Sequence, residues 1–89
     1  NLVWKIELSA RARKALKKLD RKPARDIVRA LEEIAKLQDP RSRGKALTGN
    51  LQGLWRYRVG DYRVICDIRN QQLTIYAIDL GHRRNIYRF

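Results

Sequence analysis

The chain has 89 residues, and its 21 Lys and Arg against 9 Asp and Glu give a formal net charge of +12 at pH 7. A chain of this length holds one hydrophobic core, so we expect residues 1–89 to form a single domain, and its positive charge favours a polyanionic partner: nucleic acid, an anionic membrane surface or an acidic protein. No apolar run reaches the roughly 18 residues that cross a bilayer, and no signal-peptide core is visible, which argues against a membrane protein and predicts a cytoplasmic one.

The first half of the chain predicts one strand followed by two helices. Leu2–Leu8 alternates in short period and carries Trp, Ile and Val, which is typical of a strand. Ser9 is suited to cap a helix that begins at Ala10, and Pro23 is suited to the first turn of a second helix. Both helices have an apolar stripe at helical spacing, and the first has a basic outer face. The two helices are therefore expected to form an αα-hairpin.

The second half predicts a loop and then three strands. Asp39–Gly53 contains one proline and three glycines among polar residues, so we expect a long connecting loop. Leu54–Val59 and Tyr62–Ile68 alternate around a two-residue Gly60-Asp61 turn, and Leu73–Leu80 is apolar enough for a central strand. The order β-α-α-β-β-β predicts a compact α+β domain in which the αα-hairpin packs on a mostly antiparallel four-stranded sheet.

Alternation also sorts the side chains of the second and third strands onto two faces. The apolar set, which includes the single cysteine Cys66, has to meet the helices, so we expect this thiol to be buried and structural. Arg56, Arg58 and Arg63 then lie together on the opposite face, where they repel one another unless an anion lies among them. Any one of them alone is explained as a solvated side chain. Together with the arginines near the C-terminus, they favour a phosphate-binding surface.

Two stretches of the sequence resemble a known family. The run LTGNLQGLWRYRVGDYRVICDI at Leu47–Ile68 is similar to the core pattern of the RelE/ParE toxin superfamily, and LGHRRNIYRF at Leu80–Phe89 points to its RelE branch. The resemblance covers essentially the whole chain and implies the compact RelE-like fold. It also implies the toxin of a type II toxin–antitoxin system, which enters the ribosomal A site and cuts the mRNA there. In that family the 2′-hydroxyl attacks the adjacent phosphate, without a metal or other cofactor.

The resemblance also implies roles for particular residues. The catalytic positions fall on Arg56, Arg58, Arg63, Arg83 and Tyr87. The residues expected to contact RNA are Lys45, His82, Arg84 and Arg88. Cleavage requires a base for the 2′-hydroxyl, positive charge for the phosphorane and an acid for the departing 5′-oxygen, and fixed arginines suit the second task.

The second-strand positions depart from the family pattern, in which well-studied members carry lysine. Arg56 and Arg58 stay protonated, whereas a lysine can in principle exchange a proton. Either the base is elsewhere, with Tyr87 and His82 as candidates, or the cut is slower and driven by geometry and electrostatics. His82 titrates near neutrality, and it is equally well explained as a local structural residue at a strand end.

The partners that the resemblance implies are the 30S A site with its mRNA and a cognate acidic antitoxin, whose complex with the toxin often represses its own operon through operator DNA. Two other functions stay open. One is a ParE-like toxin that inhibits DNA gyrase, and the other is a non-catalytic homologue that only binds a partner. A nuclease for free RNA is disfavoured, because the sequence has no paired His or His/Glu acid–base set.

Overall fold

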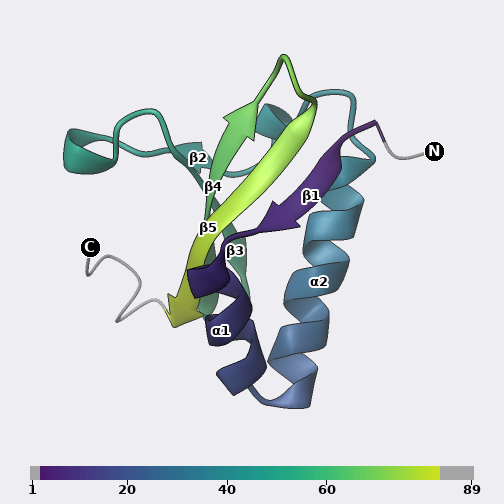
Figure 1. Ribbon diagram of the computed structural model, residues 1–89, viewed down its shortest axis with the longest axis vertical. Helices are drawn as coiled ribbons and strands as arrows, with labels where there is room; N and C mark the ends of the chain where they lie inside the picture. The colour runs from purple at the N-terminus through teal and green to yellow at the C-terminus, as the bar shows by residue number, and fades with distance from the viewer. Residues whose placement is uncertain (1–2, 83–89) are drawn as a thin grey trace.

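The computed structural model describes residues 3–82 and shows two helices and five strands in that range (Figure 1). In chain order these are β1 (Lys5–Leu8), α1 (Ala10–Lys18), α2 (Arg21–Ala35), β2 (Lys45–Ala46), β3 (Trp55–Val59), β4 (Tyr62–Arg69) and β5 (Thr74–His82). Two short 3₁₀ turns, Pro40–Ser42 and Gly49–Leu51, lie between α2 and β3. None of the helices in the described range has the length and apolar character needed to cross a membrane.

The strands form one sheet in the order β1-β5-β4-β3-β2, in which β1 and β5 run parallel and the other neighbours run antiparallel. The expected α+β class, with an αα-hairpin on a mostly antiparallel sheet, is confirmed. The sheet has five strands where four were expected, because β2 lies within the predicted loop Asp39–Gly53. A strand of two residues is too short to show an alternation of apolar and polar side chains, so its sequence resembles a loop.

Local hydrogen bonds explain where the first elements begin. Strand β1 begins at Lys5, because the N–H groups of Val3 and Trp4 both donate to the carbonyl oxygen of Ala35, at 3.2 and 3.1 Å. Ser9 caps α1 as expected, with its Oγ accepting the N–H of Ala12 at 3.0 Å. Helix α2 begins at Arg21, which places Pro23 in its first turn as expected.

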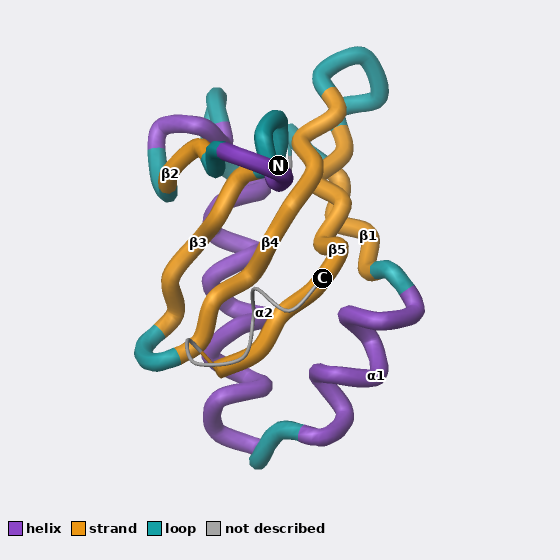
Figure 2. The backbone as a smooth tube through the Cα atoms, turned by 90° about the vertical axis from the view of Figure 1, so that its left-hand side faces the viewer, coloured by secondary structure: helices purple, strands orange, loops and turns teal. Residues whose placement is uncertain are grey.

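The two helices cover one face of the sheet, as Figures 1 and 2 show. The core between these layers draws buried side chains from both helices and from β3, β4 and β5, and it includes Trp4, which precedes β1. Its members are Trp4, Ala12, Ile27, Leu31, Ile34, Ala35, Tyr57, Val64, Cys66, Ile68, Ile75, Ala77 and Leu80. Cys66 has no exposed surface, so the expected burial of the thiol is confirmed.

This burial predicts a loss of stability at alkaline pH. Burial, with a smaller contribution from Asp67, raises the pKa of the Cys66 thiol from 9.0 to about 12. Between these pH values the unfolded chain releases the thiol proton while the folded chain keeps it, so ionisation favours unfolding. The free energy of unfolding is expected to fall above pH 9 by up to about 1.4 kcal/mol per pH unit.

Urea unfolding at several pH values measures this slope. A Cys66→Ala variant should be less stable but should lose less stability between pH 9 and pH 10, since the thiol proton is gone. Above pH 10 the variant should keep a slope from Tyr57, because burial also raises the pKa of this phenol. Equal slopes in both proteins just above pH 9 would contradict the assignment to Cys66.

Candidate functional site

The β3–β4 hairpin closes at Gly60, whose φ of +61° is a conformation that glycine adopts without a steric penalty. The tight turn fixes the register of the two strands. Arg58 lies directly across from Arg63, and Arg56 lies across from Ile65. Since residues directly paired across strands point to the same side of a sheet, the three arginines share one face, as the alternation predicts.

Strand β2 adds a fourth cation to this face. Lys45 lies directly across from Arg56, and we call Lys45, Arg56, Arg58 and Arg63 together the cationic face. It lies on the side of the sheet turned away from α2, which lies behind β3 and β4 in Figure 2. Its two cross-strand pairs, Lys45 with Arg56 and Arg58 with Arg63, bring like charges together, which is unfavourable. An anion bound among them would relieve this repulsion.

Arg63 is held within the cationic face by partial burial. Ile65, its neighbour on this face, is fully buried, while Arg63 is half-buried and Arg58 is exposed. The Nε–H of Arg63 is buried and has no hydrogen-bond partner among the described residues, a state that is costly for a charged donor. The ion pairs within residues 3–82 join other side chains, so neither Arg58 nor Arg63 is neutralised. The pair therefore favours an anion with several acceptor oxygens, such as a phosphate.

Arg58→Gln is expected to raise the free energy of unfolding of the free protein by about 0.2–1 kcal/mol, because it removes the like-charge contact with Arg63. Thermal unfolding at low salt measures the effect, and added salt should reduce it by screening the repulsion. Arg69→Gln is the matched control on β4, since Arg69 forms an ion pair with Asp67 at 3.0 Å and its loss should not stabilise. A destabilised Arg58→Gln protein at low salt would contradict the repulsion.

A bulge in β5 decides which face carries His82. The register shifts between Ile65 and Cys66, which leaves one extra residue in β5 and reverses the alternation beyond it. His82 consequently pairs with Tyr62 on the core side of the sheet, where the two rings meet edge to face with centroids 5.7 Å apart. The structure does not bring His82 to the cationic face, so its position gives no support to the expected RNA contact.

Asp79 follows Ile78, the extra residue of this bulge, and the sequence reasoning missed it. Its buried side chain accepts the N–H of Leu80 at 2.8 Å and forms an ion pair with Nε of Arg11 in α1 at 3.1 Å. The Ser9 hydroxyl donates to the carbonyl oxygen of Ile78 in the same bulge. A buried acid needs such partners. An acidic residue inside an otherwise apolar strand is therefore the sequence signal that could have identified Asp79 as a buried, partnered residue.

The other expected site residues are not placed by the structure. Arg83, Arg84, Tyr87 and Arg88 lie outside the described residues, and their roles stay predictions. Within residues 3–82, no three His, Cys, Asp or Glu side chains are grouped as ligands of a metal ion would be. Of the expected residues, the structure brings together Lys45, Arg56, Arg58 and Arg63.

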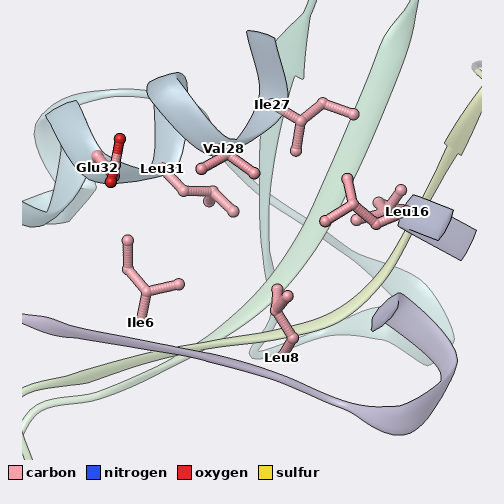
Figure 3. A pocket seen from close by; sticks show the side chains of 8 residues that line it. Ile6, Leu8, Leu16, Ile27, Val28, Leu31 and Glu32 are labelled. Carbon is pink, nitrogen blue, oxygen red and sulfur yellow. The ribbon is translucent and has the colours of Figure 1, made fainter. Parts of the chain in front are cut away.

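An apolar hollow of about 320 Å³ lies on the other side of the sheet, between β1, α1 and α2 (Figure 3). Its lining is apolar apart from Glu32 and consists of Ile6, Leu8, Leu16, Ile27, Val28, Leu31, Glu32 and Leu80. Val28 is 40% exposed, so the hollow opens to the surface. This hollow and the cationic face are separated by the sheet and are therefore free to bind different partners.

A family model described as "ParE toxin of type II toxin-antitoxin system, parDE" matches residues 6–87. The match and the fold place the protein among the toxins of type II toxin–antitoxin systems. A curated protein named Toxin RelE, from Mycobacterium tuberculosis, is 39% identical over 71 residues, which cover 68% of this chain and 63% of that protein. The match thus spans less than two thirds of the relative's length. The chain belongs to the RelE/ParE toxin family.

Solved structures confirm the expected RelE-like fold. A chain in the crystal structure of the toxin–antitoxin complex RelBE2 from Mycobacterium tuberculosis matches with a TM-score of 0.83 and 24% identity, over 94% of this chain and 95% of that one. The archaeal RelE–RelB complex from Pyrococcus horikoshii matches with a TM-score of 0.73 and 25% identity, over 94% and 99%. The isolated E. coli RelE toxin matches with a TM-score of 0.73 and 16% identity, over 89% and 83%.

Proposed function

We propose that this protein is a ribosome-dependent endoribonuclease that cleaves mRNA in the A site and so inhibits translation. The cationic face carries the proposal, because it holds four cations in two like-charge pairs that a bound phosphodiester would relieve. The identity with Toxin RelE and the resemblance of the sequence to the RelE branch support the same activity. The family model, which is described as ParE toxin, fits the ParE-like alternative equally well.

The proposed reaction is a metal-independent transfer within the message itself. The 2′-hydroxyl loses its proton, its oxygen bonds to the adjacent phosphorus, and the bond from phosphorus to the 5′-oxygen breaks. The departing oxygen takes up a proton, which leaves a 2′,3′-cyclic phosphate and a 5′-hydroxyl. Negative charge grows on the phosphoryl oxygens in the transition state, so the fixed cations Arg58 and Arg63 stabilise that state more than the bound message.

Proton transfer needs a group other than these arginines, which stay protonated. His82 lies on the other side of the sheet, so we assign proton transfer to Tyr87. We assign to Arg83, together with Arg63, the stabilisation of the negative charge in the transition state. The RNA backbone contacts are assigned to Lys45, Arg84 and Arg88.

We further propose that a cognate acidic antitoxin holds the toxin inactive and that their complex binds operator DNA. Solved structures similar to this chain include RelE with RelB. The apolar hollow is lined by Leu16 of α1, a helix that also carries five basic residues, and a segment with both apolar and acidic side chains suits this combination. When the antitoxin is lost, the toxin would act on the 30S A site in the cytoplasm.

Primer extension on a defined message in a purified translation system tests the activity. We expect cuts inside A-site codons that appear only when ribosomes translate the message, with the same RNA lacking ribosomes as the control. An intact message with growth still blocked would overturn the proposal in favour of a ParE-like toxin acting on DNA gyrase. An intact message with normal growth would favour a non-catalytic, partner-binding homologue.

A further inference from the structure

A hollow of about 330 Å³ lies between α2 and the outer edge of β3, and its uncharged lining residues are Ala30, Ile34, Gly44 and Tyr57. Strand β2 pairs with β3 only at Trp55 and Arg56, so the hollow extends from the Lys45–Arg56 pair along the edge of β3 that has no neighbouring strand within the described range. Its charged lining residues are all cationic: Arg43, Lys45, Arg56 and Arg58. Three of these belong to the cationic face, so the hollow continues that face around the edge of the sheet. Arg43 is the addition, and sequence reasoning missed it.

Two aromatic side chains of β3 hold the segment that carries Arg43. Nε1 of Trp55 donates to the carbonyl oxygen of Arg43 at 2.6 Å, and the Tyr57 hydroxyl donates to the carbonyl oxygen of Pro40 at 2.7 Å. Gly44 packs so closely on β3 that a Cβ there would lie 2.4 Å from the Arg56 carbonyl oxygen. We call residues 40–45 the strap. Its backbone is held against β3, which keeps the exposed side chain of Arg43 beside the hollow.

Three of the four cations around the hollow form no ion pair with an acid among residues 3–82. These three are Arg43, Lys45 and Arg58. The hydrogen bonds from Trp55 and Tyr57 to the strap therefore hold Arg43 near the cations of β3, and electrostatic attraction does not. A ligand with negative charges repeated along a chain could pair with the cations of the hollow and of the cationic face at the same time, whereas a single small anion cannot reach both.

We propose that this hollow is a second phosphate-binding subsite, in which Arg43 and Lys45 hold an mRNA phosphate adjacent to the one being cleaved, with Trp55 as the positioning residue for Arg43. The role in cleavage rests on the proposed function, since the adjacent phosphate is defined by the reaction at Arg58 and Arg63. The subsite itself is a property of RNA binding and is measured without cleavage.

The test uses a short single-stranded RNA with 2′-O-methyl groups throughout, which this reaction cannot cut. Binding is followed by fluorescence anisotropy over a range of salt concentrations. Arg43→Gln should weaken binding and make the slope of log K against log salt shallower by about 0.7, the value for one phosphate contact on a single strand. Arg25→Gln, an exposed arginine on α2, is the matched control and should change the slope less.

A double-mutant cycle tests the positioning role of Trp55. Trp55→Phe removes the Nε1–H donor and should reproduce part of the loss, but it should add little in the Arg43→Gln background. Additive losses would show that Trp55 acts on stability alone and would overturn its role. If Arg43→Gln and the wild type had the same slope of log K against log salt for RNA binding, the subsite would be overturned. If the Arg43→Gln protein then bound poly-glutamate more weakly than the wild type, the hollow would be assigned to an acidic protein.

These outcomes separate the subsite from the proposed function. If ribosomes cut the message while the Arg43→Gln slope is unchanged, the subsite fails and the proposed function stands. If the message stays intact while Arg43→Gln makes the slope shallower, the proposed function fails and the protein keeps an RNA-binding hollow at the edge of β3.

Discussion

Arg63→Ala is expected to lower the rate of A-site cleavage by about 10²–10³-fold, the usual effect of removing one group that stabilises transition-state charge. Arg63 is the suited cation because it is half-buried and lies across from Arg58 on a rigid hairpin. Single-turnover primer extension on programmed ribosomes measures the rate. Arg63→Lys should recover only part of it, since an ammonium lacks the planar donor fork of a guanidinium.

The control for net charge is Arg25→Ala, which removes an exposed arginine on the helix side of the molecule. This variant should cut the message at nearly the wild-type rate. Circular dichroism and thermal unfolding establish that Arg63→Ala is folded, which is expected because the replacement also removes a like-charge contact. If both variants lost the same activity, Arg63 would have no specific role in the reaction.

The parts of the fold that depend on neighbouring residues were predictable from the sequence. The Ser9 cap, Pro23 in the first turn of α2 and the turn at Gly60 are each decided within a few residues. Strand β2 was not predictable, because its two residues are extended only through pairing with β3. That pairing requires the close approach of Gly44, which is a contact between segments distant in the sequence.

In the candidate site, too, features set by local alternation were predictable and features set by contacts between distant segments were not. Alternation placed Arg56, Arg58 and Arg63 correctly, because β3 and β4 pair in regular register over their whole paired length. The same counting along β5 from Ala77 would put His82 on the cationic face, and the bulge reverses this. Arg11 of α1 and Ser9 make the contacts at the bulge, and both lie far from β5 in the sequence, so counting along the strand does not reveal the reversal.

Gly44→Ala is expected to lower the free energy of unfolding by about 2–5 kcal/mol. The φ of Gly44 is +79°, a left-handed conformation that costs about 1–2 kcal/mol for an L-residue with a Cβ. The added Cβ would also lie 2.4 Å from the carbonyl oxygen of Arg56 and 2.7 Å from Nε1 of Trp55, and crowding of this kind costs about 1–3 kcal/mol more. Urea unfolding measures the sum.

Gly49→Ala separates the two contributions. Gly49 has a similar φ of +67°, but an added Cβ there meets no atom within 4 Å, so only the backbone cost of about 1–2 kcal/mol is expected. The difference between the variants then reports the contact of the strap with β3. Since relief of that clash moves Lys45 away from Arg56, Gly44→Ala should also cut mRNA more slowly than Gly49→Ala when both are folded. Equal losses of stability would mean that the strap moves freely, and Arg43 would then have no fixed place beside the cationic face.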